Sequence, residues 1–256
     1  MNATVPPRLS VNVNKIATIR NSRGGDVPSV LEAVSVCIGA GAPGITVHPR
    51  ADARHITAQD VRQIAGALSS RRDSGGSAGT VEYNIEGDPR PDLLALIHEV
   101  RPDQCTLVPV KPGEITSQAG WSPETPAGEL EAIVRRLRED GIRVSLFIDP
   151  DPAAVRWAAS VGATRVELYT EPFARAHSRG GRPAQESFDL YSTVASLAHG
   201  LGLGVNAGHD LDLSNLTLFR SLPHLDEVSI GHALISRALF VGLDRSVRDY
   251  LAALQA

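Results

Sequence analysis

Histidine and arginine side chains gather where a short apolar segment of the sequence ends. Gly44-Ile45-Thr46-Val47 reads as a buried strand, and His48, Arg50 and His55 follow it within eight positions. An imidazole titrates near neutral pH and suits proton transfer, while an arginine fork gives two parallel hydrogen bonds to a phosphate or carboxylate. A solvated polar loop is the alternative, but the position at a strand end favours a site that moves protons and binds an anion.

Two glutamates lie inside segments that read as strands. Glu86 ends the run Val81–Glu86, and Glu167 stands between Val166 and Leu168. Burial raises the pKa of a carboxyl group, which lets a glutamate act as an acid or base near neutral pH. For Glu86 the alternative is a position at the start of a helix. For Glu167 a structural salt bridge in the protein interior is an equally good interpretation.

Small and polar residues follow the last two predicted strands. His209-Asp210 comes after Asn206-Ala207-Gly208, and Gly231-His232 precedes a helix that begins at Ala233. Backbone N–H groups at such a helix start bind phosphate. In (β/α)₈ barrels, the loops after the seventh and eighth strands are the usual phosphate position.

Two glycine-containing loops add candidates for binding. Arg23 precedes Gly24-Gly25 in a flexible loop and could close over an anion, although the Lys-Ser/Thr ending of a P-loop is absent. The segment Lys111–Trp121 reads as a lid with hinges at Gly113 and Gly120, which would keep an intermediate from water.

Short β-branched runs alternate with amphipathic ones throughout residues 1–256, without a break in composition. This alternation predicts one (β/α)₈ TIM barrel domain with minor additional helical and loop elements; an open doubly wound sheet is the competing arrangement. The predicted strands are Leu9–Asn14, Gly44–His48, Thr80–Glu86, Gln104–Val108, Arg143–Ile148, Arg165–Tyr169, Gly204–Asn206 and Glu227–Ile230. The predicted helices are Val30–Ala40, Thr57–Leu68, Asp92–Val100, Gly128–Glu139, Pro152–Ser160, Phe188–His199, Leu213–Arg220 and Ala233–Leu254.

Composition restricts the classes of partner. The formal net charge is −4, with 25 basic and 29 acidic residues, which argues against a nucleic-acid surface or an anionic membrane. No apolar run is long enough to span a bilayer, so we expect a cytoplasmic protein. Cys37 and Cys105 have no metal-ligand spacing and read as buried thiols, and we expect no metal site.

The order of these motifs resembles the pyridoxine 5′-phosphate synthase family. The resemblance covers essentially the whole chain without large gaps, and it implies a (β/α)₈ barrel in a homo-oligomer, with an octamer expected and no metal or organic cofactor. The motifs that carry it are Val11–Gly24, Gly44–Arg50 with Arg54–Ile56, Asn84–Gly87, Leu107–Pro109, Glu114–Thr116, Val144–Asp149, Val205–His209 and Ile230–Ala233.

The resemblance also implies a reaction between two small phosphorylated substrates. It would join 1-deoxy-D-xylulose 5-phosphate to 3-amino-2-oxopropyl phosphate, release phosphate and water, and close a pyridine ring. By motif, His48 and Glu86 would act as bases, His209 would donate a proton, and Glu167 would stabilise a charged intermediate. The amino-ketone phosphate would contact Asn12, Arg23, Asp210, Gly231 and His232, and the deoxyxylulose phosphate would contact Asn14, Lys15, Arg50, His55 and Thr116.

The sequence departs from the usual family pattern at two places. It has Asn14-Lys15 where the family usually has Asp-His, and Asp210 where the family usually has Gly. Asn14 keeps a hydrogen-bonding oxygen without the charge, and Lys15 can still donate to a hydroxyl or phosphate. Asp210 would repel a neighbouring phosphate unless its carboxylate is turned away.

Two other functions fit the same residues. Lys15 could form a Schiff base, as in barrel aldolases that act on phosphosugars, if burial lowered its pKa. A catalytically silent phosphosugar-binding protein is the second alternative. Binding alone does not require His48, Glu86, Glu167 and His209 together, so the sequence favours an enzyme.

Overall fold

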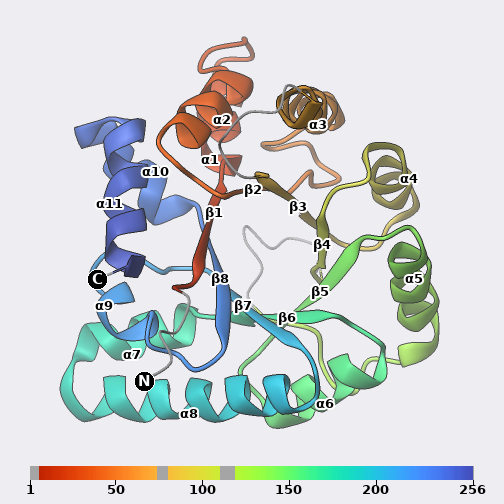
Figure 1. The fold of residues 1–256 in the computed structure, drawn as a ribbon, viewed down its shortest axis with the longest axis vertical. Coiled ribbons are helices and arrows are strands. Elements are labelled where there is room, and N and C mark those ends of the chain that lie inside the picture. The colour runs from red at the N-terminus through yellow and green to blue at the C-terminus, as the bar shows by residue number, and fades with distance from the viewer. Residues whose placement is uncertain (1–5, 74–79, 110–118, 256) are drawn as a thin grey trace.

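The computed structural model describes residues 6–73, 80–109 and 119–255, and in them eight parallel strands close into a barrel surrounded by helices (Figure 1). Each strand pairs with its neighbours along the chain, and the first pairs with the last. This closure confirms the predicted (β/α)₈ barrel and excludes the doubly wound sheet. The strands are β1 (Arg8–Asn12), β2 (Gly44–Val47), β3 (Glu82–Gly87), β4 (Gln104–Leu107), β5 (Arg143–Ile148), β6 (Arg165–Tyr169), β7 (Gly204–Gly208) and β8 (Leu225–Ile230).

Each predicted helix has a counterpart, with corrections to the bounds: α8 begins at Gly181 and not at Phe188, and α9 is shorter than predicted at both ends. Asn14, predicted as the end of a strand, begins α1. Helices α1 and α7 were not predicted, and the predicted long helix Ala233–Leu254 is two helices because the chain turns at Gly242, whose φ is 83°. The helices are α1 (Asn14–Asn21), α2 (Val30–Gly39), α3 (Ala58–Asp73), α4 (Pro91–Val100), α5 (Ala127–Glu139), α6 (Pro152–Ser160), α7 (Glu171–Arg179), α8 (Gly181–Gly200), α9 (Leu216–Phe219), α10 (His232–Val241) and α11 (Leu243–Gln255).

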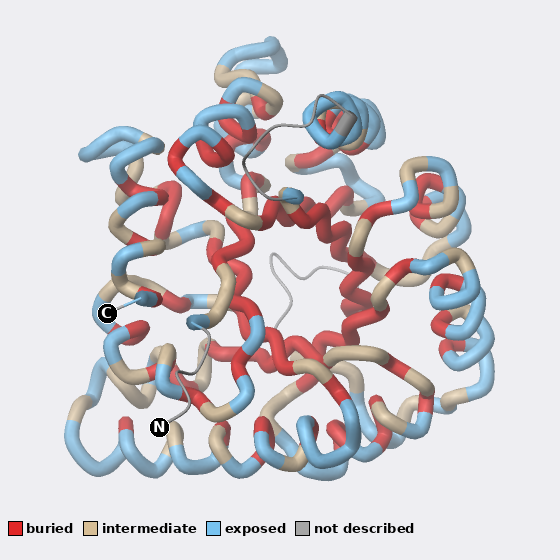
Figure 2. The backbone as a smooth tube through the Cα atoms, viewed as in Figure 1, coloured by how far each residue is buried: buried red, intermediate tan, exposed pale blue. Residues whose placement is uncertain are grey.

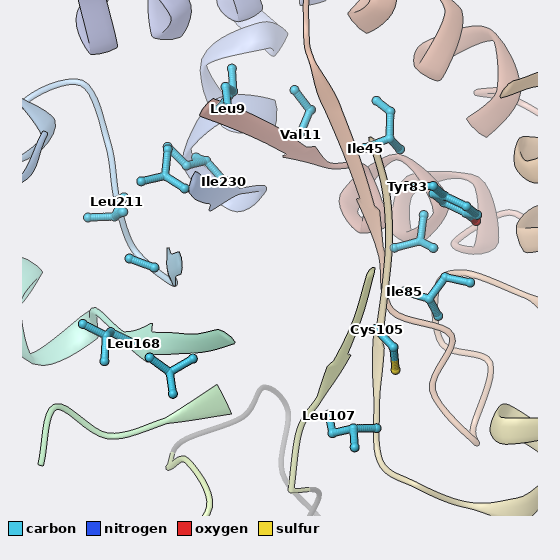
Figure 3. Close-up of a cluster of buried hydrophobic side chains, with 14 of the residues drawn as sticks. Leu9, Val11, Ile45, Tyr83, Ile85, Cys105, Leu107, Leu168, Leu211 and Ile230 are labelled. Atoms are coloured by element: carbon cyan, nitrogen blue, oxygen red, sulfur yellow. The ribbon is translucent and has the colours of Figure 1, made fainter. Parts of the chain in front are cut away.

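The residues of the barrel strands are mostly buried (Figure 2). The side chains on the two faces of the barrel wall differ in chemistry. The outer face packs apolar side chains such as Leu9, Val11 and Ile45 between the strands and the helices (Figure 3). Polar side chains occupy the interior: Asn206 Nδ2 on β7 donates to Gln104 Oε1 on β4 at 3.4 Å, a contact that crosses the barrel. Branched apolar residues usually fill such interiors, so this barrel has an unusually polar centre.

Ion pairs close the end of the barrel at which the strands begin. Glu82 Oε2 accepts from Arg8 at 2.9 Å, and Glu82 Oε1 lies 2.5 Å from Arg143 Nη2. Arg165 Nη1 lies 2.9 Å from Asp226 Oδ2. This end is therefore occupied by bound side chains. Cys37 and Cys105 are buried free thiols, as expected.

Asp60 fastens α1 to the start of α3. Its carboxylate accepts from Arg20 Nη1 at 2.5 Å and Nη2 at 2.9 Å, and from the backbone N–H and hydroxyl of Thr57, both at 2.8 Å. Arg20 Nη2 and Asn21 Nδ2 also donate to the carbonyl oxygen of His55, at 3.3 and 2.8 Å. The N–H of Asp60 donates to Thr57 Oγ1 at 3.2 Å, which caps the start of α3, and α1 holds the segment that carries His55.

Among the described residues, no helix combines the length and the apolar character needed to cross a membrane.

We predict that Asp60→Asn lowers the free energy of unfolding by about 3 kcal/mol, because it removes one charge of a largely buried, doubly hydrogen-bonded pair. Burial opposes ionisation of Asp60, but hydrogen bonds from Arg20 and Thr57 lower its pKa overall. Urea unfolding measures the change. Asp244→Asn removes an exposed partner of Arg248 and should leave the urea midpoint nearly unchanged; equal midpoints for the two variants would contradict the prediction.

Candidate active site

A cavity of about 470 Å³ opens at the end of the barrel where the strands finish. The predicted residues that line it are Asn12, Asn14, Lys15, His48, Arg50, His55, Glu86, Glu167, His209, Asp210, Gly231 and His232. These residues come from different βα units, so closure of the barrel brings them to one place. The predicted catalytic side chains therefore share a single cavity.

Asparagine side chains at the start of α1 position His48. The backbone N–H of His48 donates to Asn14 Oδ1 at 2.9 Å, and the N–H of Asn14 donates to Asn12 Oδ1 at 3.1 Å. Both bonds need only an oxygen acceptor from the side chain. Asparagine at position 14 therefore supports the end of β2 as well as an aspartate would, while carrying no charge into the cavity.

His48, the residue that follows β2, forms a pair with Glu86 on the neighbouring strand β3. His48 Nδ1 lies 3.8 Å from Glu86 Oε2, and His48 Nε2 is buried without a hydrogen-bond partner among the described residues. Burial, followed by His55 and Arg50, lowers the pKa of His48 well below its usual value. The imidazole is therefore neutral at neutral pH, with a nitrogen able to accept a proton from a bound substrate.

Glu86 is a carboxyl group that titrates close to physiological pH. Burial and then Glu227 raise its pKa to about 8, against the effect of a hydrogen bond from Ser229 Oγ to Glu86 Oε1 at 3.4 Å. Asn12 Nδ2 donates to the other oxygen, also at 3.4 Å. Long hydrogen bonds of this kind stabilise the ion only weakly, so Glu86 can both give and take a proton.

Glu167 enters the cavity from the wall opposite β2 and depends on a glycine. Burial, then Glu86, raises the pKa of Glu167 well above the usual value. A Cβ at Gly208 would lie 2.5 Å from Glu167 Oε1 and 3.2 Å from the carbonyl oxygen of Ser229. Only glycine leaves this space, so Gly208 fixes where the Glu167 carboxyl group can lie.

His209 lies against two aromatic rings at the ends of β5 and β6. Its ring centroid is 4.9 Å from Phe147 and 5.4 Å from Tyr169, and its backbone is held at φ 80°. Burial lowers its pKa to about 4, and Asp210 partly opposes this. A negative charge beside the ring would raise this pKa.

Basic side chains line the side of the cavity near α1. Lys15, Arg50 and Arg54 lie there with His55. His55 Nδ1 accepts from the N–H of Ile56 at 3.0 Å, which leaves the proton of the neutral ring on Nε2. Burial, then Arg50 and Lys15, lowers the pKa of His55 to about 4. The positive charge suits a phosphate.

The start of α10 lies beside α1, because β8 pairs with β1. Gly231 is the residue before the helix, and a Cβ there would lie 3.1 Å from Asn12 Oδ1. Its size therefore allows β1 and β8 to approach. The N-terminus of an α-helix favours negative charge, so the start of α10 is suited to bind an anion. Asp210 is exposed and takes a left-handed conformation with φ 58°, which aspartate tolerates better than most residues.

Two predicted binding residues are not placed in the cavity. Arg23 is exposed and is absent from the described residues that line it. Thr116 and most of the predicted lid lie outside the described residues. Gly120 is described, and it is a packing position: a Cβ there would lie 2.2 Å from the Cα of Ile148. The hinge predicted at Gly120 is therefore replaced by a tight contact with β5.

Several lining residues were not predicted. Phe147 and Tyr169 read as ordinary core residues, and Ser229 carries no signal of its own in the sequence. The position of Tyr169 at the carboxyl end of a predicted strand was the available clue. The other unpredicted lining residues are Thr18, Arg54, Val108, Leu211, Ile230 and Ala233. In residues 6–73, 80–109 and 119–255, no group of three or more His, Cys, Asp or Glu side chains could hold a metal ion.

The fold and the cavity define a (β/α)₈ barrel protein with titratable and basic side chains gathered at the carboxyl ends of its strands. Residues 9–256 match the model of the family described as pyridoxal phosphate biosynthesis protein PdxJ, and the chain belongs to this family.

Relatives of the chain carry a consistent name. It is 49% identical over 251 residues to the pyridoxine 5′-phosphate synthase of Leptospira biflexa, with 96% of each chain covered. It is 49% identical over 244 residues to the protein of the same name from Porphyromonas gingivalis, covering 95% of this chain and 97% of the relative.

Solved structures with low sequence identity share the barrel. The YdjI aldolase of Escherichia coli K12 aligns with a TM-score of 0.60 at 12% identity, covering 98% of this chain and 89% of that one. Phosphoribosyl anthranilate isomerase from Thermus thermophilus aligns with a TM-score of 0.55 at 17% identity, covering 97% and 98%. At these identities the likeness concerns the fold alone.

We predict that Gly208→Ala lowers kcat by about a hundredfold, because the new methyl group displaces the Glu167 carboxyl group, and small displacements of catalytic groups are costly. Steady-state kinetics measures the loss. Gly200→Ala, at a helix position where a Cβ meets nothing within 4 Å, is the control and should retain the activity of the unaltered chain. A normal kcat for Gly208→Ala would contradict the prediction, because it would show that the Glu167 carboxyl group can move aside without loss of activity.

Proposed function

We propose that the chain is a pyridoxine 5′-phosphate synthase that condenses 3-amino-2-oxopropyl phosphate with 1-deoxy-D-xylulose 5-phosphate. The products are pyridoxine 5′-phosphate, phosphate and two molecules of water, which balances the atoms. The observation that carries the proposal is the pair formed by His48 and Glu86. His48 Nδ1 lies 3.8 Å from Glu86 Oε2, and His48 Nε2 is buried without a hydrogen-bond partner among the described residues. Family membership supports the same reaction.

The proposed chemistry needs several proton transfers. Condensation of an amine with a ketone, loss of phosphate and aldol-type ring closure each move a proton to or from the substrate. Neutral His48 and the ionised form of Glu86 serve as bases. His209 donates a proton once a phosphate raises its pKa, and Glu167 stabilises charge on the intermediate from the opposite wall.

Two phosphates need two anion sites, and the cavity supports this assignment. The deoxyxylulose phosphate is assigned to the basic side with Asn14, Lys15, Arg50 and His55, together with Thr116. The amino-ketone phosphate is assigned to the start of α10, with Gly231, His232, Asn12 and Asp210. The assignment of Arg23 to the same phosphate rests on the family resemblance alone, because Arg23 does not line the cavity. The exposed position of Asp210 leaves room for its carboxylate to turn away from the phosphate.

The Schiff-base alternative has less support. It required a buried Lys15 with a lowered pKa, but Lys15 is exposed at the first turn of α1. A silent binding protein would leave four buried or half-buried titratable groups in one cavity without a role.

Self-association is also part of the proposal. Leu239, Phe240 and Val241 at the end of α10 have exposed fractions of 68%, 88% and 40%, an apolar surface that suits a contact between copies. The octamer rests on the family resemblance, and the cytoplasmic location stays a prediction.

We predict that the purified protein forms pyridoxine 5′-phosphate and releases phosphate when both substrates are supplied, and that His48→Asn abolishes turnover while retaining substrate binding. The reason is that Asn keeps the shape near the cavity but cannot accept a proton. Product absorbance, phosphate release and calorimetric binding are the measurements. His199→Asn, on the exposed end of α8, is the control. An unaltered chain that binds both substrates without forming product would leave the binding protein as the better function.

We predict that light scattering gives a mass of about eight chains and that Phe240→Ser reduces it, because the substitution removes the most exposed apolar side chain of α10. Size-exclusion chromatography with light scattering measures both proteins. A single-chain mass for the unaltered protein would contradict the self-association.

A further inference from the structure

Glu227 is a buried carboxyl group that the proposed reaction does not use. It lies on β8 with an exposed fraction of 4%, and it is not among the described residues that line the cavity. Within the described ranges its one hydrogen bond comes from Asn206 Nδ2, at 3.5 Å. A buried carboxylate that accepts only one long hydrogen bond is costly in its charged form, so the neutral acid is favoured.

Strand register connects Glu227 to the cavity. Asn206 on β7 is paired with Glu167 on β6 and with Glu227 on β8, so the three side chains lie side by side across three strands. Arg165 Nη1 donates to Asn206 Oδ1 at 2.9 Å, which directs the amide nitrogen toward Glu227. Two strand positions beyond Glu227, Ser229 donates to Glu86.

The charged groups that face Glu227 do not neutralise it. Arg8 on β1 is bound by Glu82 on β3, Arg165 on β6 is bound by Asp226, and Glu82 also holds Arg143 on β5. Burial and Glu82 raise the pKa of Glu227 to about 8, with Glu167 contributing in the same direction and Arg8 and Arg165 opposing.

Three acids therefore share one buried interior. Glu227 acts on Glu86, and Glu86 acts on Glu167, each through repulsion between negative charges. When one of these carboxyl groups ionises, the others hold their protons more firmly.

We propose that Glu227 is a positioning residue that holds a proton beneath the cavity and thereby controls how readily Glu86 and Glu167 release theirs during the reaction. The inference rests on the proposed function. While Glu227 is protonated, Glu86 can ionise and act as a base. When Glu227 is ionised, the proton stays on Glu86 and Glu167.

The test is the pH dependence of kcat and kcat/KM in Glu227→Gln. A permanently neutral amide removes the repulsion, so the acid limb of the activity profile should move to lower pH by about half a unit or more. KM should stay within about twofold, because residue 227 does not contact substrate. Glu227→Asp keeps the charge and should return the limb toward its original position.

Glu99→Gln is the matched control. It makes the same chemical change on α4, on a half-exposed side chain that pairs with Arg62 away from the barrel interior. Its acid limb should coincide with that of the unaltered enzyme. If the Glu227 carboxyl group had only a structural role, Glu227→Gln would change kcat or stability. Its acid limb would then stay where it is in the unaltered enzyme.

Infrared spectroscopy tests the proton directly and needs no activity. The carboxylic acid band should persist at neutral pH, and the difference between the unaltered protein and Glu227→Gln should titrate with a midpoint at about 8.

Each outcome decides a separate question. An unaltered chain that forms no product refutes the proposed function, while the infrared band still reports on Glu227. A productive enzyme whose acid limb does not move in Glu227→Gln overturns the inference. It is also overturned if Glu227→Asp and Glu227→Gln give the same profile.

Discussion

Removal of titratable side chains from water is the interaction on which this molecule depends. The closed barrel buries carboxyl groups that would be ionised in solution and imidazoles that would be partly charged. Burial raises the pKa of Glu86 to about 8 and lowers that of His48. Both shifts favour the neutral form, so at neutral pH the cavity holds an imidazole that can accept a proton beside a carboxyl group that can give one up. The same burial explains why basic residues gather at the rim, where water remains available.

The polar interior extends the effect of burial from single side chains to a group of acids that interact with one another. Most barrels of this kind pack branched apolar layers beneath their active sites. Here Asn206 lies in register with two glutamates, and Gln104 contacts it from across the barrel. The buried acids on different strands therefore repel one another when they are ionised. The ion pairs of Glu82 and Asp226 close the polar interior at the end of the barrel where the strands begin.

Much of the site could be predicted because strand ends are visible in sequence. An apolar run that finishes in His48 or Glu86 places that side chain at the rim of a barrel once the parallel order is inferred. Helix α1 was missed because its polar and β-branched composition resembles a loop. Gly242 was read as part of a long helix, although its left-handed backbone ends α10. Glu227 was predicted only as the first residue of a strand, at the end far from the rim, where the barrel pattern gives no reason to expect a functional side chain.

Local chemistry in the sequence determined the eight strands, the residues at their ends and the family, since hydrophobic period and short motifs depend on neighbours along the chain. The tertiary structure alone decided which of those side chains lose water and which meet. The space that Gly208 leaves for Glu167, the support that Asn14 gives His48, and the alignment of Glu167 with Glu227 all join residues far apart in sequence. Distances and desolvation arise only when the barrel closes, because both depend on what the rest of the chain places nearby.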